Sequence, residues 1–176
     1  LTIHGGLLGG VAAGWIMARR LRLRFWMLAD LYARALAIAL GIGRIGCLLA
    51  GCCFGRLTGG DWGCTTVYAP GLRHPSQLYE TFLLTLLFIY LSWRMGKPRR
   101  LGQLFGLFVA GYGIARFLAE FFREGERVAA GLTLGQLVSL GLLLLGAAIW
   151  YLRRNSMPVG EPGGSVEPKV ERPGPG

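Results

Sequence analysis

Charged side chains are scarce in this sequence of 176 residues, at 16% of the chain, whereas soluble globular domains carry about a quarter. Acidic residues are the scarcer kind, with 9 Asp and Glu against 19 Lys and Arg, so the formal net charge is +10. A nucleic-acid-binding protein would carry that charge on a basic face of a soluble body, and a hydrophobic content of 53% argues against such a body. A membrane protein whose positive charge lies in its cytoplasmic loops accounts for both observations.

Charge is also absent from long stretches of the chain. Residues 128–152 contain no charged side chain, and about 20 apolar residues are enough for a helix to cross a bilayer. Four further stretches are interrupted by at most two charged residues each: 1–18, 35–55, 75–93 and 101–122. A soluble bundle would show polar outer faces at helical spacing, whereas residues 81–91 are apolar all round. The sequence therefore predicts an all-α polytopic membrane protein with about five transmembrane helices.

The two ends of the chain differ from this apolar part. Residues 155–176 lack aromatic side chains and are rich in Pro, Gly, Glu and Ser, so we expect a disordered cytoplasmic tail after a transmembrane domain at 1–154. The chain starts at Leu1, without the positively charged region or cleavage site of a signal peptide. We interpret this start as that of a fragment that lacks upstream helices.

Basic residues predict the orientation. Clusters of Arg and Lys follow the first, third and fifth stretches, at 19–24, 94–100 and 153–154, and the positive-inside rule puts these junctions in the cytoplasm. The intervening segments, 51–74 and 123–132, are nearly balanced in charge and are expected outside. The first residue then lies outside and the C-terminus inside.

Ionisable residues within the apolar stretches are candidates for a functional site, because each costs several kcal/mol in the hydrocarbon unless it is paired or hydrated. We place the cytoplasmic start of the second span near Leu28, 16 residues before Arg44, so at a rise of 1.5 Å per residue Arg44 lies about 24 Å across the membrane. Arg116, 15 residues past Leu101, lies about 22 Å across, with Glu120 one turn further. His4 and His74 lie at the same outer level. Several cations around a carboxylate at this depth suit an anionic phospholipid headgroup, since guanidinium binds phosphate through two hydrogen bonds.

Each of these residues also has a purely structural interpretation. Arg116 and Glu120, four positions apart, can form a simple ion pair within one helix. Arg44 can extend its side chain to the membrane interface, and either histidine alone can be an interfacial residue. The functional interpretation is favoured because four separate pieces of sequence converge on one depth.

Glycines recur at four-residue spacings in the first stretch, a pattern typical of helices that pack closely through small residues. Gly41, Gly43 and Gly46 match G-x-G-x-x-G, but no strand precedes them and no βαβ unit follows, so they do not indicate a dinucleotide site. We expect these three glycines to break the helix and to let a lipid headgroup or a backbone approach Arg44.

Four cysteines, Cys47, Cys52, Cys53 and Cys64, lie at or beyond the outer end of the second stretch. An oxidising exterior would permit a disulfide, most easily between Cys64 and one of the adjacent pair. No metal site is expected, because the spacing is not C-x-x-C and no histidine is near in sequence. The sequence indicates neither a catalytic thiol nor a cofactor.

Five short blocks follow one another in the chain. They are HGGLLG at 4–9, GRIG with GCCFGR at 43–56, RHPSQLYE at 73–80, YGIARFLAEFFR at 112–123 and GLTLGQ at 131–136. Together they resemble, in the same order and over roughly residues 1–140, the prolipoprotein diacylglyceryl transferase family of bacterial inner-membrane enzymes. Five ordered blocks are far more specific than any one of them.

The resemblance implies a fold of seven transmembrane helices, of which this chain holds the last five, with the active site toward the outer leaflet of the inner membrane. It also implies the activity. The diacylglyceryl group of phosphatidylglycerol passes to the thiol of the lipobox cysteine in the signal peptide of a prolipoprotein, which is the first step of lipoprotein maturation. A thioether forms and glycerol phosphate is released.

The resemblance also implies roles for single residues. His4 and Arg44 occupy positions held to be essential in the family, and Arg44 lies in its phosphatidylglycerol-binding stretch. Arg116 and Glu120 match the paired residues of the penultimate helix, and Gly55 matches a loop glycine.

Another block of the family contains the positions of His74, Gln77 and Tyr79, and we take Gln77 and Tyr79 as substrate-binding residues. The chain departs from the commonest family pattern at Cys47, where an Asn usually follows Gly-Arg-x-Gly. We interpret this as the mark of a cysteine-rich subgroup.

These residue types suit the implied chemistry. The leaving phosphate needs cations, which Arg44 and Arg116 would supply, and Glu120 would orient Arg116. The attacking thiol needs a base, because its free pKa of about 8.5 leaves it mostly protonated near neutrality. A neutral histidine, His4 or His74, would take the proton.

The alternative from another class is a membrane transporter or lipid-binding scaffold in which the same buried charges line a substrate path. Transporters commonly carry an internal repeat and a site at mid-membrane. The sequence shows no repeat, and its charges gather at the outer level instead.

We expect the Arg44→Lys variant to be nearly inactive, because lysine keeps the charge and loses the two-pronged contact of guanidinium with phosphate. The measurement is transfer of label from phosphatidylglycerol to a lipobox peptide. Transfer close to that of the unchanged protein would contradict the role given to Arg44.

Overall fold

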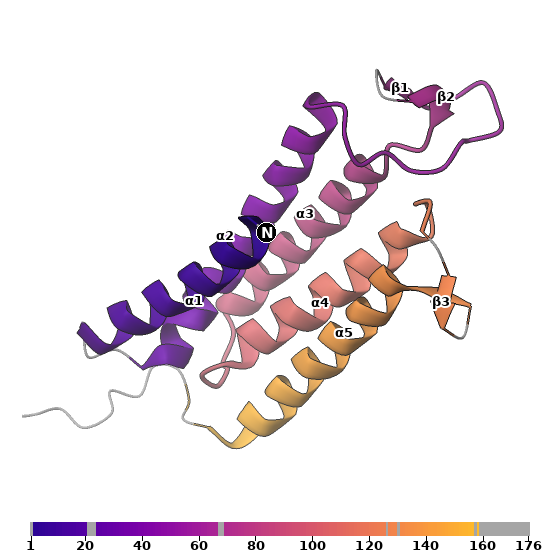
Figure 1. Ribbon diagram of the computed structural model, residues 1–176. Helices are drawn as coiled ribbons and strands as arrows, with labels where there is room; N and C mark the ends of the chain where they lie inside the picture. The colour runs from indigo at the N-terminus through magenta and orange to yellow at the C-terminus, as the bar shows by residue number, and fades with distance from the viewer. Residues whose placement is uncertain are drawn as a thin grey trace, which may run out of the picture.

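The computed structural model describes residues 2–20, 24–66, 69–125, 127–129, 131–156 and 158, with the backbone alone at 2–8 and at five isolated positions. Its helices are α1 (Thr2–Arg20), α2 (Phe25–Leu49), α3 (Ser76–Met95), α4 (Gln103–Glu120), α5 (Leu134–Leu152) and a short 3-10 helix, Arg153–Asn155. Two antiparallel hairpins pair β1 (Cys64–Thr66) with β2 (Ala69–Arg73) and β3 (Arg127–Ala129) with β4 (Leu132–Thr133). Helices α2 to α5 lie side by side, and both hairpins lie at one end of this bundle (Figure 1).

The described chain is mostly helical, as predicted, but two helices begin elsewhere than expected. Helix α2 begins at Phe25, three residues before the predicted start near Leu28 and ten before the stretch 35–55, and α5 begins at Leu134 rather than at 128. The segment before α5 forms the second hairpin instead, which turns at Gly131 with a φ of 74°. Of the predicted tail, residues 157 and 159–176 lie outside the described residues.

The one acidic residue of α2 has a structural role. The carboxylate of Asp30, 4% exposed, accepts hydrogen bonds from the backbone N–H groups of Gly102 (2.8 Å) and Phe105 (2.9 Å). The first N–H groups of a helix have no partner within it, and the N-cap of α4 is a glycine without a side chain to supply one. A carboxylate from α2 therefore caps α4, which compensates for its burial.

The glycines of α2 do not have the expected effect. Helix α2 runs through Gly41, Gly43 and Gly46 without a break and ends only at Leu49. The expected helix break at these glycines is therefore wrong, because the helical hydrogen bonds continue past them. Gly51, with a φ of 68°, turns the chain just after the helix end.

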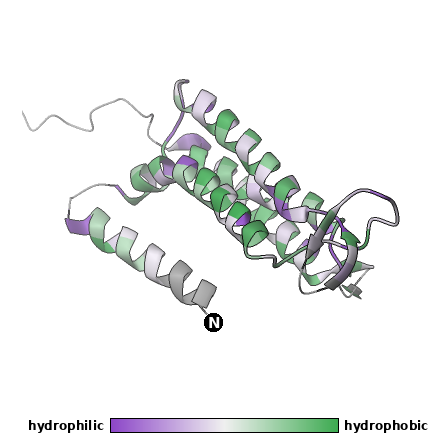
Figure 2. Ribbon diagram, turned by 90° about the horizontal axis from the view of Figure 1, so that it is seen from above, coloured by the Kyte–Doolittle hydropathy of each residue, from purple (hydrophilic) through white to green (hydrophobic). Residues whose placement is uncertain are grey.

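Large apolar side chains cover the outside of the helices. A small core of six residues lies between them, namely Ala33, Ala37, Leu91, Leu104, Phe108 and Val109. By contrast, Trp15, Leu40, Ile89 and Leu144 belong to a large set of exposed hydrophobic residues, and Glu80 is almost fully buried. Figure 2 shows hydrophobic residues along the whole length of the bundle. An apolar exterior around buried polar groups suits a lipid environment.

Among the described residues, two helical segments are long and apolar enough to cross a membrane, Phe25–Leu49 and Leu134–Asn155. Helix α1 stands apart from the rest of the bundle in Figure 2, and its principal contacts are with α2. Its glycines at positions 9, 10 and 14 have no neighbouring atoms, among the described residues, within 4 Å of where a Cβ would lie. The expected close packing through these glycines is therefore absent from the described part of the chain.

Close packing through glycine occurs between α4 and α5 instead. A Cβ added at Gly146 of α5 would lie 2.7 Å from the carbonyl oxygen of Gly106 and 2.8 Å from the Cα of Ala110, both on α4. A Cβ at Gly113 of α4 would lie 2.8 Å from the carbonyl oxygen of Ser139 on α5. The backbones of the two helices thus touch at two levels, and only glycine permits this approach.

We expect Gly146→Ala to lower the free energy of unfolding by about 3 kcal/mol, because the new methyl group must separate two backbones. The matched control is Gly141→Ala on the same helix, where a Cβ meets nothing within 4 Å. Thermal unfolding in detergent, followed by helical circular dichroism, compares the two. Equal melting temperatures for both variants would contradict the tight α4–α5 contact.

Candidate active site

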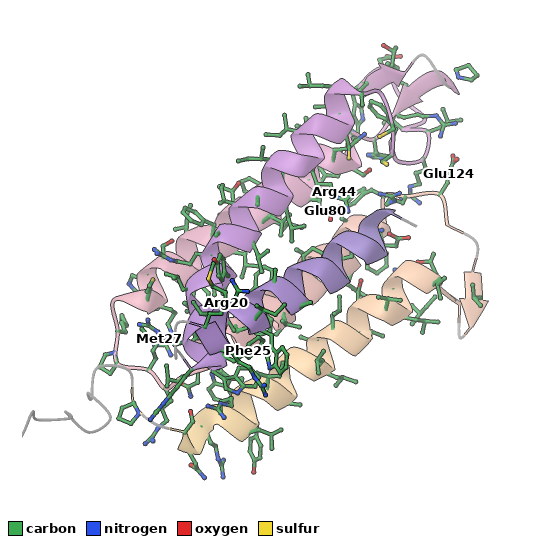
Figure 3. The ribbon with its side chains drawn as sticks, turned by 60° about the vertical axis from the view of Figure 1, so that its left-hand side comes forward. Arg20, Phe25, Met27, Arg44, Glu80 and Glu124 are labelled. Atoms are coloured by element: carbon green, nitrogen blue, oxygen red, sulfur yellow. The ribbon has the colours of Figure 1, made fainter. Side chains whose placement is uncertain are left out.

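A buried carboxylate connects three helices near the hairpin end of the bundle. Glu80 of α3, whose side chain is 2% exposed, lies 2.9 Å from Arg44 Nη2 of α2 and 3.5 Å from Arg116 Nη1 of α4. Figure 3 shows Arg44 and Glu80 side by side, far from the Arg20 end of the bundle. Two of the predicted site residues are thus brought together by a third residue between them.

A second carboxylate extends this cluster toward α5. Glu120 lies 3.0 Å from Arg116 Nη2 and 3.8 Å from Arg123 Nε, and it accepts a hydrogen bond of 3.3 Å from the hydroxyl of Thr133. Thr133 is also the N-cap of α5, and a Cβ at Gly135 would lie 2.6 Å from the Glu120 carboxylate. The carboxylate therefore lies against the N-terminus of α5, whose partial positive charge stabilises it.

The cluster carries more positive than negative charge. With all groups ionised, Arg44, Arg116 and Arg123 outnumber Glu80 and Glu120 by one. The two shortest contacts join Arg44 to Glu80 Oε1 and Arg116 to Glu120 Oε2. Neither contact has the alignment of a hydrogen bond, so these two oxygens accept no hydrogen bond from the described residues. The side chains of Arg44 and Arg116 are 22% and 20% exposed. Both arginine side chains are thus partly exposed although they pair with buried carboxylates.

The second predicted histidine lies in a separate aromatic cluster. His74, 8% exposed, directly precedes α3, and its Nδ1 shares a hydrogen bond of 3.2 Å with the Tyr79 hydroxyl. Its ring lies nearly perpendicular to that of Trp62 and is tilted against that of Phe122, with centroid distances of 4.9 and 5.4 Å. The structure therefore brings two predicted site residues, His74 and Tyr79, together at the end of α3 that also carries Glu80.

The loop after α2 crosses this end of the bundle at Gly55. Its N–H donates to the carbonyl of His74 (2.9 Å), and the N–H of Arg56 donates to the carbonyl of Phe122 (2.9 Å). A Cβ at Gly55 would lie 2.9 Å from that of His74, so only glycine fits here. Gln77 holds the same loop, because its side-chain amide donates a hydrogen bond of 2.6 Å to the carbonyl of Cys52. Gly55 and Gln77 thus have structural contacts in the site.

His4 and the four cysteines are the remaining residues that the sequence singled out. The side chain of His4 lies outside the described residues, although its backbone belongs to α1. All four cysteines are free thiols in the structure, so the disulfide that an oxidising exterior would permit is not formed. The interaction with the adjacent Cys53 thiol raises the pKa of Cys52 to about 11. Cys52 is therefore a neutral thiol at pH 7 and a weak nucleophile.

Glu80 is the site residue that the sequence analysis misses. It is recognised there as a charged residue within the stretch 75–93 and as the last residue of the block at 73–80, without a role in the site. The position of Glu80 in the sequence could have revealed it. Glu80 follows His74 by six residues and so lies near the same outer level, where a carboxylate in an apolar stretch needs a cationic partner. Arg123 and Thr133 are missed as well, and their contacts with Glu120 depend on how α4 and α5 pack.

An apolar groove opens between α3 and α4 next to the aromatic cluster. It has a volume of about 470 Å³ and is lined by Tyr79, Phe82, Leu83, Leu118, Phe121 and Phe122. A cavity of similar size, about 500 Å³, lies at the opposite end of the bundle beside Trp26 and Arg153, away from the charged cluster. The first groove places an apolar surface beside polar groups, as an amphipathic ligand requires.

Fold and site together define a class of protein, namely a helical membrane protein with a buried, net positive arginine–glutamate cluster near one end of its bundle. Residues 1–152 match the family model described as prolipoprotein diacylglyceryl transferase. The chain belongs to that family.

Curated relatives named phosphatidylglycerol–prolipoprotein diacylglyceryl transferase are similar over most of the chain. The protein of Idiomarina loihiensis is 37% identical over 169 residues, which cover 91% of this chain and 62% of the relative. That of Pasteurella multocida is 40% identical over 165 residues (89% and 60%), and that of Geobacter sulfurreducens 41% over 158 residues (86% and 61%). The chain thus spans about three fifths of the length of these relatives.

We expect Glu80→Gln to lower the free energy of unfolding by about 3 kcal/mol, because it leaves two partly buried arginines without their shared carboxylate. The control is Glu124→Gln, whose side chain is 59% exposed and pairs with Arg73 at the surface, and which should cost less than about 1 kcal/mol. Unfolding of both variants in detergent is measured against the unchanged protein. A Glu80→Gln variant as stable as the Glu124→Gln variant would show that the cluster does not hold the helices together.

Proposed function

We propose that the protein is a transferase that moves the diacylglyceryl group of phosphatidylglycerol to the thiol of the lipobox cysteine in a prolipoprotein signal peptide. The observation that carries this proposal is the net positive cluster of Arg44, Arg116 and Arg123 around two carboxylates, close to an apolar groove. A phospholipid has the complementary form, with an anionic phosphate next to apolar chains. The names of the three curated relatives support the same reaction, and none of the three is named as a transporter.

The arginines would act on the phosphate that leaves. The peptide sulfur attacks the diacylglyceryl carbon, a thioether bond forms, and the carbon–oxygen bond to the phosphate breaks, so that glycerol phosphate departs with the electron pair. Guanidinium groups of Arg44 and Arg116 stabilise the charge that develops on that oxygen. Glu80 and Glu120 act as positioning residues, since they hold both guanidinium groups in place.

A base must take the proton of the attacking thiol. A neutral histidine suits this task, and the two candidates are His4 and His74. His74 shares its Nδ1 with the Tyr79 hydroxyl, so its other ring nitrogen is left for proton transfer. Gly55, Gln77 and Tyr79 would shape the substrate-binding surface, Gly55 by allowing the loop to pass close to His74.

The groove between α3 and α4 would receive the acyl chains. Its lining residues Phe82 and Leu118 are among the exposed large hydrophobic side chains, and Tyr79 joins the groove to His74. A lipid could then enter sideways from the bilayer, with its phosphate directed toward the arginines. No cofactor or metal is required for this reaction.

We also propose a location and a topology. Residues 1–154 would form a transmembrane domain of five spans, the last five of seven, in the bacterial inner membrane, and 155–176 a disordered cytoplasmic tail. The basic junctions at 19–24, 94–100 and 153–154 support a cytoplasmic C-terminus, with both hairpins and the charged cluster toward the outer leaflet.

We expect Arg116→Gln to reduce transfer at least 100-fold, because removal of one group that stabilises developing charge typically costs that much. The control is Arg154→Gln, an exposed arginine at the opposite end of the bundle, which should retain activity within about twofold. The assay follows label from phosphatidylglycerol to a lipobox peptide, and a peptide with serine in place of the cysteine sets the background. Label on the serine peptide, or equal activity of the two variants, would overturn the proposal.

A further inference from the structure

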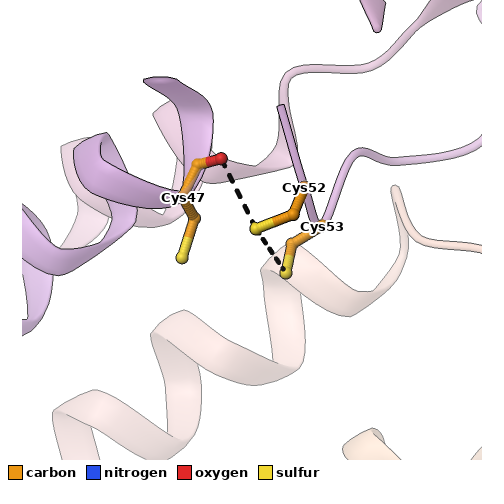
Figure 4. A group of neighbouring side chains, drawn as sticks. All are labelled: Cys47, Cys52 and Cys53. Atoms are coloured by element: carbon orange, nitrogen blue, oxygen red, sulfur yellow. Dashed lines mark hydrogen bonds between the residues drawn. The ribbon is translucent and has the colours of Figure 1, made fainter. Parts of the chain in front are cut away.

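Three thiols meet where α2 ends. Cys47 lies in the last turn of the helix, and Cys52 and Cys53 lie in the loop that follows, yet all three sulfur atoms are within 4.8 Å of one another. The sulfur atoms of Cys52 and Cys53 are 3.5 Å apart (Figure 4). The fourth cysteine, Cys64, lies on β1 and is not part of this thiol cluster.

The backbone is bent so that the thiols converge. The N–H of Cys52 donates to the carbonyl of Cys47 (3.1 Å), after a turn at Gly51. Cys53 has a φ of 68°, and among the described residues it is the one residue other than glycine with a positive φ. A side chain in this left-handed conformation is strained, and such strain persists where the surrounding structure enforces it and often marks a functional site.

Buried side chains of α3 enforce this conformation. The hydroxyl of Ser76 donates to the carbonyl of Cys53 (3.0 Å), and the amide of Gln77 donates to that of Cys52 (2.6 Å). Ser76 and Gln77 are each 1% exposed. The two loop cysteines are therefore fixed against a rigid helix end, with their thiols left to face Cys47.

We propose that Cys47, Cys52 and Cys53 form a binding site for a thiophilic metal ion, with Zn²⁺ and Cu(I) as the two ions that such a ligand set suits. Metal–sulfur bonds are about 2.3 Å, so three thiolates around one ion lie about 4 Å from each other. The thiols are already nearly that close. The spacing of the cysteines along the chain predicts no metal site. The turn at Gly51 nevertheless brings Cys47 beside Cys52 and Cys53.

The charge of the metal complex would be offset by a neighbouring arginine. Binding deprotonates the three thiols and releases three protons to solvent, so that Zn²⁺ with three thiolates carries one negative charge. Arg44 lies three residues before Cys47, on the same face of α2, and supplies a nearby positive charge. Soft thiolate ligands select Zn²⁺ and Cu(I) over the hard ions Mg²⁺ and Ca²⁺.

The test is anaerobic titration of the reduced protein in detergent with Zn²⁺ and, separately, with Cu(I), each against a competing chelator. We expect one equivalent of at least one of these ions per chain. The Cys52→Ser variant should bind at least 100-fold more weakly, and Cys64→Ser, the matched control outside the thiol cluster, should bind as the unchanged protein does. The preferred ion is the one that is bound when both are offered together.

A second measurement keeps the test valid if a variant folds poorly. Cd²⁺ gives an absorption band from charge transfer with thiolates, and its intensity should fall by about one third for each cysteine removed from the thiol cluster and stay constant in Cys64→Ser. Failure to bind either ion stoichiometrically, or equal losses in Cys52→Ser and Cys64→Ser, would overturn the proposal. The transferase assay is independent of this outcome, because the proposed reaction uses none of these thiols.

Discussion

The burial of one carboxylate between two arginines organises the hairpin end of this molecule. Glu80 is almost fully enclosed, and burying an ion is costly unless its partners are well placed. Arg44 and Arg116 meet this need from the helices on either side, so α2, α3 and α4 are held at one level. Glu120 repeats the arrangement between α4 and the N-terminus of α5. The same contacts that keep the helices together leave the guanidinium groups partly open, which is what an anionic substrate requires.

Much of the helical plan could be predicted from the distribution of charge. Gaps between charged residues locate five helices, since few charges are tolerated in such segments. The stretch nearly free of charge does not mark the start of α2, because Asp30 lies inside that helix and caps α4. The hairpins before α3 and before α5 could not be predicted either, since strands of two to five residues carry too little alternation to be recognised.

The depth of the site residues could be predicted from the sequence, whereas their contacts with one another could not. Counting the helical rise places Arg44, Arg116 and Glu120 at one depth, because rise per residue is a local property. Their connection through Glu80 depends on which faces of α2, α3 and α4 meet, and that is a tertiary property. The thiol cluster escapes prediction likewise, because the turn at Gly51 brings together cysteines whose spacing matches no metal-binding motif.

The contact of α4 with α5 through glycine has a mechanical consequence. The backbones of α4 and α5 touch at Gly106, Gly113 and Gly146, so these contacts leave no space for a larger side chain and resist compression. The groove between α3 and α4 therefore has one wall anchored to α5 by backbone contact and another anchored to α2 and α4 by the ion pairs of Glu80.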